Sequence, residues 1–306
     1  MPMDRPFRFA AVVREAGSAR AWAEKARRLE GSGFDALLVP DHLVGPRFAP
    51  VAAMTAAACA TTRLRVGTLV FANDFRHPAV LAKEAATVDL LSEGRLELGL
   101  GTGWMAADYT RAGLELRPPG VRVDRLAEAI TVLKGLWSDG PFTIHGEHYR
   151  ITGLDQTPKP WRRPHPRLLL GGGGPRMLRL AAREADVINL GMRVRADGTG
   201  PDGTDGGLAA FLAKIDTVRR AAGDRYDRIE LGTSVQQLGV RKKGEPWSAA
   251  DSSRQDETPQ VLLGTRQDVV DKLRHWRDAH DLSYFVLHHE RDLDAFTPVV
   301  EELAGR

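Results

Sequence analysis

Residues 89–104, DLLSEGRLELGLGTGW, place the end of a helix, a strand and a glycine turn one after another. The helical stretch over residues 78–91 has proline at its first position, where helices tolerate it. Residues 96–101 are apolar or glycine apart from one glutamate, and they predict a short strand. Gly101-Thr102-Gly103 then turns the chain. A helix that leads into an apolar strand is one unit of an α/β fold.

The same alternation runs through the whole chain. Strands are predicted at residues 7–13, 36–40, 64–71, 96–101, 168–171, 187–190, 229–237 and 284–288. Helices are predicted at residues 19–30, 51–60, 78–91, 121–137, 176–185, 208–221, 266–280 and 293–303. Continuous apolar strands suit a sheet buried on both faces. Eight such units favour a single closed TIM (β/α)8 barrel domain over residues 1–306, with an open doubly wound sheet as the alternative.

Three segments fall outside this alternation. Residues 142–151 predict a small excursion with strand character. Residues 195–207, RADGTGPDGTDGG, predict a mobile loop because they are rich in glycine and poor in apolar side chains. Residues 239–258 are polar and precede the last unit. In a barrel the last two are insertions on the C-terminal face, where long loops act as lids or substrate walls; plain disorder is the alternative.

Composition argues against several partners. The 43 basic and 40 acidic residues are interleaved and leave a net charge of +3, so no nucleic-acid partner is expected. The single cysteine, Cys59, excludes an intrachain disulfide and suits a reducing compartment. Its apolar neighbours predict a small buried side chain. The N-terminus lacks a signal-peptide run and no stretch is long enough to span a bilayer, so a cytoplasmic protein without a membrane partner is expected.

Polar residues just past strand ends are the first candidates for chemistry, because they point into the site of a barrel. Asp41-His42 follows the second predicted strand directly. An imidazole at a strand end can shuttle protons near neutral pH, and an adjacent carboxylate can raise its basicity. The alternative is a plain turn.

Two glycine-rich turns are the next candidates. Gly101-Thr102-Gly103-Trp104 would let a planar ring approach the backbone, with Trp104 as an aromatic wall; a tight turn with a packed tryptophan is the alternative. Residues 171–174 are four glycines before a helix, and bare N–H groups at a helix N-terminus make a phosphate cradle. The nine histidines are scattered, so no metal site is expected.

Taken together, these motifs resemble the luciferase-like flavin and deazaflavin oxidoreductases. The resemblance runs from about residue 7 to residue 285. It rests on Gly33-Phe34-Asp35, Asp41-His42, residues 63–68, residues 75–78, residues 89–104, and residues 261–265 followed by a helix.

The resemblance implies a TIM barrel, a homodimer and a flavin-type cofactor at the strand ends. In such proteins a non-proline cis peptide in the third strand forms a bulge behind the cofactor ring, and its motif position here is Leu69-Val70. His42 would handle a substrate proton as the catalytic residue. The cofactor-binding residues that the resemblance implies are Asp41, Leu69, Val70, Thr102, Gly103, Trp104, Gly172, Gly173, Gly174, Asn189 and Leu190.

The resemblance leads to one preferred function and several alternatives. The preferred one is an oxidoreductase that transfers hydride between coenzyme F420, a deazaflavin, and a small organic substrate. An FMN-dependent monooxygenase, supplied with reduced flavin by a separate reductase, is the alternative. A metal-assisted hydrolase and a non-catalytic flavin-binding relative are further alternatives. Trp104 stands where deazaflavin sugar-phosphate dehydrogenases carry an acidic glutamate, which argues against a sugar-phosphate substrate.

Overall fold

The computed structural model describes residues 5–241 and 257–306. Parallel strands within these residues form a ring in the order β3-β2-β1-β13-β10-β9-β8-β5-β4. The ring closes because β3 also pairs with β5, so the barrel is confirmed over the open sheet. The ring strands are β1 (Arg8–Val12), β2 (Ala36–Val39), β3 (Arg65–Thr68), β4 (Phe71–Ala72), β5 (Leu96–Gly101), β8 (Arg167–Gly172), β9 (Val187–Leu190), β10 (Glu230–Val235) and β13 (Leu282–Leu287).

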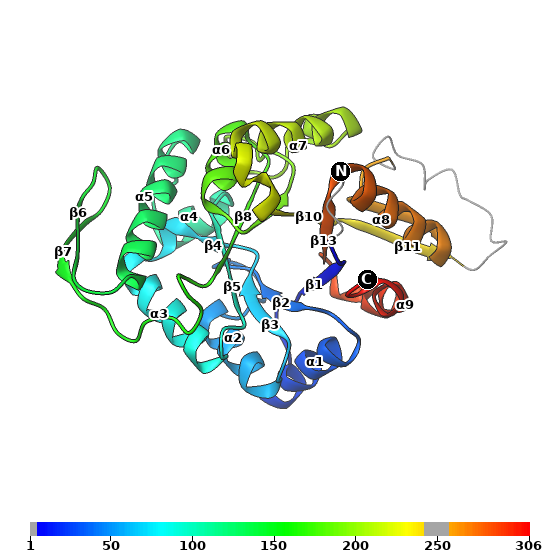
Figure 1. The fold of residues 1–306 in the computed structure, drawn as a ribbon, viewed down its shortest axis with the longest axis horizontal. Coiled ribbons are helices and arrows are strands. Elements are labelled where there is room, and N and C mark those ends of the chain that lie inside the picture. The colour runs from blue at the N-terminus through cyan, green and yellow to red at the C-terminus, as the bar shows by residue number, and fades with distance from the viewer. Residues whose placement is uncertain (1–4, 242–256) are drawn as a thin grey trace.

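Helices surround the ring of strands (Figure 1). They are α1 (Ala19–Gly31), α2 (Pro50–Ala60), α3 (Pro78–Leu91), α4 (Ala106–Ala112), α5 (Pro119–Trp137), α6 (Pro175–Glu184), α7 (Leu208–Ala222), α8 (Arg266–His280) and α9 (Leu293–Leu303). Every predicted helix lies within two residues of its expected bounds. Proline stands at the first position of α2, α3, α5 and α6. It marked the start of α3 correctly, whereas the predicted starts of α2, α5 and α6 fall one or two residues after the proline.

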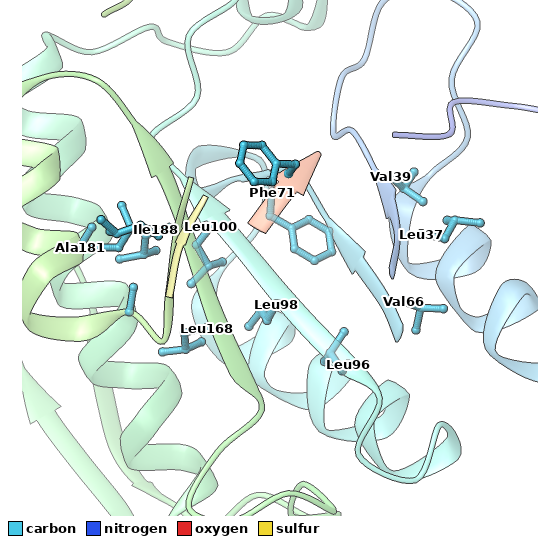
Figure 2. Packing of buried hydrophobic residues seen from close by; sticks show 14 of the residues in the cluster. Leu37, Val39, Val66, Phe71, Leu96, Leu98, Leu100, Leu168, Ala181 and Ile188 are labelled. Atoms are coloured by element: carbon cyan, nitrogen blue, oxygen red, sulfur yellow. The ribbon is translucent and has the colours of Figure 1, made fainter. Parts of the chain in front are cut away.

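Each strand sends alternate side chains to two different layers. One set fills the barrel interior, and it consists of Ala10, Val12, Ala36, Leu38, Leu169, Val187, Tyr284 and Val286. The other set packs under the helices. Figure 2 shows part of this outer layer, in which Leu96, Leu98 and Leu100 of β5 lie along one side of the strand. The interior is therefore a packed core, which leaves the strand ends as the place for a site.

The structure departs from the predicted strands at two places. The third strand is interrupted at Leu69 and Val70, between β3 and β4. The predicted strand over residues 229–237 ends at Val235, and Gln237 instead begins β11 (Gln237–Arg241), which pairs with β12 (Val261–Thr265) outside the ring. The excursion over residues 142–151 is confirmed as a hairpin of β6 (Phe142–His145) and β7 (Arg150–Leu154), which projects from the barrel in Figure 1.

Both predicted loops contain regular structure. Residues 195–207 include a hydrogen bond from Arg195 N to Gly200 O of 2.9 Å, and Ala106 N at the start of α4 donates to Gly198 O at 3.1 Å. The sequence indicated the glycines of this loop but not α4, its partner. In the second loop, residues 239–241 belong to β11, and residues 242–256 lie outside the described residues.

The predicted burial of Cys59 is wrong. Cys59 is exposed, because α2 buries residues 53, 54, 57 and 58 and thereby turns position 59 outward.

Within the described residues, no helix is long and apolar enough to cross a bilayer.

Candidate functional site

A cavity of about 620 Å³ opens at the C-terminal ends of the ring strands. It is lined by residues from the ends of β2, β5, β8, β9, β10 and β13 and from the break between β3 and β4. The predicted site residues that line it are Asp41, His42, Leu69, Val70, Thr102, Gly103, Trp104, Gly172, Gly173, Gly174 and Asn189. The structure thus brings the Asp-His pair and the tetraglycine stretch to the same rim of the barrel.

Leu190 is the predicted site residue that does not line this cavity. Its side chain belongs to the outer layer under the helices and is fully buried there. Successive side chains of a strand point to opposite faces, so Asn189 and Leu190 cannot both face the interior. The expectation that Leu190 lines the site is wrong for this reason.

The bulge behind the cavity is present where the resemblance placed it. The peptide bond between Leu69 and Val70 is cis although neither residue is proline, which confirms the predicted position. Both residues line the cavity. A Cβ at Gly101 of the neighbouring β5 would lie 2.5 Å from Val70 Cγ2, so glycine is needed there for the bulge to pack against β5.

Asp41 forms an ion pair with Arg76, a partner that the sequence did not reveal. Its carboxylate receives two hydrogen bonds from the Arg76 guanidinium, of 2.6 and 3.0 Å, and a third from Ala72 N at 2.9 Å. A bidentate arginine holds a carboxylate in a defined orientation. Asp41 therefore ties the end of β2 to the segment after β4, and it is not the carboxylate that pairs with His42.

His42 pairs instead with Asp108 of α4. Its Nδ1 lies 2.7 Å from Asp108 Oδ2, and Asp108 Oδ1 accepts hydrogen bonds from Leu43 N and Val44 N, each 2.9 Å long. A carboxylate only accepts, so this contact assigns the proton to Nδ1. Nε2 is then the nitrogen that can exchange a proton in the cavity. The pair has the arrangement of an oriented general base.

Trp104 contributes an aromatic wall next to this pair. Its ring meets the His42 imidazole edge to face, with centroids 5.8 Å apart and planes at 87°. Both residues line the cavity. Because an indole ring has no group that titrates near neutral pH, the His42–Asp108 pair is the proton-handling group on this wall.

The tetraglycine stretch permits close backbone packing at the rim. A Cβ at Gly173 would overlap the carbonyl oxygen of Gly191 and the backbone at Met192 and Arg193, whereas a Cβ at Gly174 would meet no atom within 4 Å. Gly173 is therefore needed so that the chain after β8 can lie against the chain after β9.

We expect Gly173→Ala to lower the free energy of unfolding by about 1–3 kcal/mol, because backbone atoms must move to admit the methyl group. Gly174→Ala is the matched control. There the loss of a good N-cap and the stiffer unfolded chain offset each other, so the change should stay within about 0.5 kcal/mol. Urea denaturation measures both. Equal stability of the two variants would contradict the packing argument.

The start of α6 is suited to an anion. Gly174 is its N-cap and supplies no side-chain hydrogen bond, and Pro175 and Arg176 follow at the cavity wall. The first N–H groups of a helix have no partner within the helix and carry its positive end. Asn189 Oδ1 is also buried at the cavity wall without a hydrogen-bond partner, while its Nδ2 donates to Ser234 Oγ at 3.2 Å. The first turn of α6 therefore supplies N–H donors for a phosphate, and Asn189 Oδ1 supplies an acceptor for the polar edge of a ring. These residues fit a flavin-type cofactor.

A second imidazole lines the cavity at the end of β13. Burial, together with the positive charges of Arg14, His289 and His42, lowers the pKa of His288 to about 4. His288 Nδ1 is buried without a hydrogen-bond partner. His288 is therefore neutral at physiological pH.

The His288 signal in an NMR titration should have its midpoint near pH 4. Since the unfolded chain takes up this proton near the ordinary pKa of 6.5, the folded protein loses stability as the pH falls from 6.5 towards 4. His288→Gln should lose less stability over that interval, and His145→Ala, on the exposed hairpin, should behave like wild type. A midpoint close to 6.5 would show that His288 is solvated or paired.

Several site residues were not predicted. Asp108 comes from a helix that the sequence analysis missed, and nothing near it in the sequence marks it as the partner of His42. Arg76 lay within a motif already used for the resemblance, residues 75–78, so a signal existed. His288 ends a predicted strand, where the same rule that selected Asp41 would have found it. Ser234 lies inside the strand predicted over residues 229–237, and the rule missed it because β10 ends earlier than predicted, at Val235. In the part of the chain that the structure describes, no three His, Cys, Asp or Glu side chains gather as metal ligands.

Comparisons with known proteins agree with this geometry. An FMNH2-dependent dimethylsulfone monooxygenase of Pseudomonas putida is 32% identical over 180 residues, which are 59% of this chain and 46% of that one. An F420-dependent glucose-6-phosphate dehydrogenase of Amycolatopsis mediterranei is 33% identical over 202 residues, 62% of this chain and 60% of that one. The matches thus span about half the length of these curated relatives.

A solved structure shares the fold over nearly its whole length. The coenzyme F420-dependent tetrahydromethanopterin reductase of Methanopyrus kandleri superposes with a TM-score of 0.78 at 16% identity, covering 98% of this chain and 99% of that one. The model of the luciferase-like monooxygenase family matches residues 5–281. The chain described here therefore belongs to the luciferase-like monooxygenase family.

Proposed function

We propose that this protein is an oxidoreductase that binds a flavin-type cofactor across its barrel and uses His42 to move the substrate proton. One observation carries the proposal: the His42–Asp108 pair and the helix terminus suited to phosphate line one cavity but lie apart on its rim. His42 follows β2, and the phosphate cradle follows β8. In the ring, the interrupted strand β3/β4 and β5 lie between β2 and β8 on one side, and β1, β13, β10 and β9 lie between them on the other.

This separation suits a ligand with a reactive ring at one end and a phosphate at the other. The phosphate would lie at Gly172, Gly173 and Gly174 and the first turn of α6. The ring would lie against the Leu69-Val70 bulge, near Thr102, Gly103 and Trp104, with Asn189 as an acceptor for its polar edge. Asp41 keeps the segment after β4 in place through Arg76. Orientation of this kind is what a protein contributes to cofactor chemistry.

The chemistry of the substrate proton belongs to the chain itself. When bound, the cofactor supplies hydride transfer, or oxygen activation if it is reduced FMN. Asp108 holds the His42 ring through Nδ1, which leaves Nε2 to take a proton from a substrate oxygen or to return it. The Trp104 ring covers one side of the His42 imidazole.

Coenzyme F420 with a small organic substrate is the preferred assignment, and an FMN-dependent monooxygenase served by a separate reductase is the second candidate. The relatives named above include one of each kind. Fluorescence titration with oxidised F420 and with FMN, followed by oxygen uptake in the presence of reduced FMN, distinguishes them. F420 binding without oxygen uptake is expected. Binding of neither cofactor would refute the proposal.

We further propose that the protein is a homodimer that associates through α2 and α3. On α3, Val80 and Leu91 are 52% and 59% exposed, and position 56 of the alanine-rich α2 is also exposed. Val80 and Leu91 are eleven residues apart, so they lie on the same face of the helix. Light scattering should give twice the mass of the chain, and Leu91→Glu should give a monomer. A monomeric wild-type protein would refute the dimer.

A further inference from the structure

We propose that the arginines along one side of the cavity bind a chain of carboxylates that continues beyond the cofactor's phosphate. This inference rests on the proposed function, because it assigns a subsite to the same bound cofactor. It also selects between cofactors. FMN ends at its phosphate, whereas coenzyme F420 continues from the phosphate, through a diester, into a tail of glutamates.

We call Arg122, Arg176, Arg179 and Arg193 the arginine rim. All four line the cavity, and they come from α5, α6 and the segment after β9. They surround the start of α6. A Cβ at Gly120 of α5 would lie 2.8 Å from Arg176 Nη1, and the backbone of Arg193 lies against Gly173. The rim therefore borders the phosphate cradle on more than one side.

Arg122 indicates that the rim is built for an anion. Arg122 is only 5% exposed. Its guanidinium donates hydrogen bonds to two main-chain carbonyl oxygens, Arg117 O at 2.9 Å and Gly103 O. It forms no ion pair with an acid among the described residues. A buried charge that lacks an opposite charge is costly, and an anion in the cavity would offset that cost.

Arg193 is held at the rim by a buried ion-pair cluster. Lys214 Nζ lies 2.7 Å from Asp205 Oδ2, and both residues are more than nine-tenths buried. Asp205 also pairs with Arg193 through Nε at 3.2 Å and accepts a hydrogen bond from Arg193 N at 2.6 Å. The side chain of Arg193 remains 47% exposed, so the cluster orients it without covering it.

Arg176 and Arg179 extend the rim outward along α6. Arg176 forms an exposed pair with Asp124 of 2.5 Å, which contributes little by itself in water. Arg179 is exposed and forms no ion pair within residues 5–241 and 257–306. Positive charge therefore continues past the first turn of α6 along the lining of the cavity.

The acidic and the basic side chains that line the cavity lie on different sides of it. Its acidic lining residues are Asp41 and Asp108, which belong to the β2 side and already have partners in Arg76 and His42. The arginines gather beside α6. A single phosphate is accommodated by the helix terminus alone. The additional arginines match a ligand that carries further negative charges on its outer side.

Fluorescence titration with three deazaflavin probes tests this inference: F420 with its glutamate tail, the glutamate-free form of F420, and the phosphate-free deazaflavin riboside. An exposed arginine–carboxylate pair contributes up to about fivefold in affinity. Wild type should therefore bind tailed F420 about tenfold more tightly than the glutamate-free form at low salt. The advantage should shrink towards 0.5 M salt, because solvent-exposed charges are screened.

Variants of α6 provide the matched comparison. Arg179→Gln should lower the preference for the tail to about twofold, because it removes one arginine–carboxylate pair, while the Kd of the glutamate-free form stays within about twofold of wild type. Arg183→Gln removes an exposed arginine from the same helix that does not line the cavity, and it should keep the full preference. Arg179→Lys should retain the salt-dependent part of the preference.

The results of these titrations distinguish failure of the tail subsite from failure of the proposed function. Equal affinities of wild type for tailed and glutamate-free F420 would overturn the inference while leaving the proposed function intact. A tail preference that survives in full in Arg179→Gln, or that Arg183→Gln also removes, would overturn it as well. If no deazaflavin binds but FMN does, the inference fails and the monooxygenase candidate stands. If neither cofactor binds, the proposed function fails together with it.

Discussion

Replacing His42 with alanine is expected to lower turnover by about 10²–10⁴-fold and to leave cofactor affinity within about twofold. The imidazole is the group on the cavity wall that is oriented by a carboxylate, at 2.7 Å from Asp108. Removing it takes away the proton acceptor but none of the groups that would hold a phosphate or a ring. Steady-state kinetics on the best substrate from a panel, with cofactor binding measured by fluorescence, gives both quantities.

Asp108→Asn separates orientation from proton transfer. An amide at this position keeps the size of the side chain but can present N–H to His42 Nδ1, which disturbs the tautomer that the carboxylate selects. We expect turnover to fall by about 10–10²-fold, with cofactor affinity unchanged. His145→Ala, a histidine substitution on the exposed hairpin, serves as the control. Unchanged turnover in His42→Ala would remove His42 from the mechanism.

Glu97→Gln should destabilise the fold by about 3–5 kcal/mol, the cost of breaking a buried ion pair by removing one partner. Glu97 is fully buried near the start of β5, at the end of the barrel opposite the cavity. It accepts hydrogen bonds from Tyr284 Oη at 2.6 Å and from Arg8 Nη2 at 3.1 Å. The amide would leave Arg8 with less opposing charge inside the barrel.

The pH dependence of this effect has a defined sign. Burial opposes the ionisation of Glu97, but the positive charges of Arg8 and Arg167 and the Tyr284 hydrogen bond outweigh it and lower the pKa of the carboxyl. Its stabilisation is therefore present above the ordinary glutamate pKa of 4.5 and is lost as the pH falls below it. The difference between wild type and Glu97→Gln should shrink on acidification.

Urea denaturation at pH 7 and at acidic pH measures both parts of this prediction. Tyr284→Phe is the comparison, because it removes one hydrogen bond to a charged group and should cost about 1.5–3 kcal/mol. Cofactor affinity should be unchanged in both variants, since the network lies away from the cavity. A Glu97→Gln protein within 1 kcal/mol of wild type would mean that this network contributes little to stability.

The elements of the barrel were largely predictable because their signals are local. Proline at the first position of α3 and an apolar run in β5 depend on neighbours a few residues away. Contacts between distant residues could not be predicted in this way. The position of Glu97 in an apolar strand predicts that it is buried, but it does not predict its partners Arg8 and Tyr284. These partners lie 89 and 187 residues away in the chain.

The candidate site was predicted in part for the same reason. The rule that polar residues after strand ends face the site selected Asp41 and His42 correctly as lining residues. It could not decide which carboxylate meets the imidazole. Asp41 is adjacent in sequence, yet it pairs with Arg76, and Asp108 reaches His42 from a helix 66 residues away.

The eightfold alternation of strands and helices and the glycines at the rim could be inferred from the residues alone, because periodicity and backbone freedom act over a few residues. The place of the bulge at Leu69-Val70 came from the resemblance to a family and not from any pattern within the chain. Which side chains meet depends on the folded chain, because closure of the ring brings β5 beside β3 and β13 beside β1. The same folding gathered the arginine rim from three separate elements. Neighbouring side chains of a strand point to opposite faces, and the packing of β9 in the ring set Asn189 at the cavity and Leu190 outside.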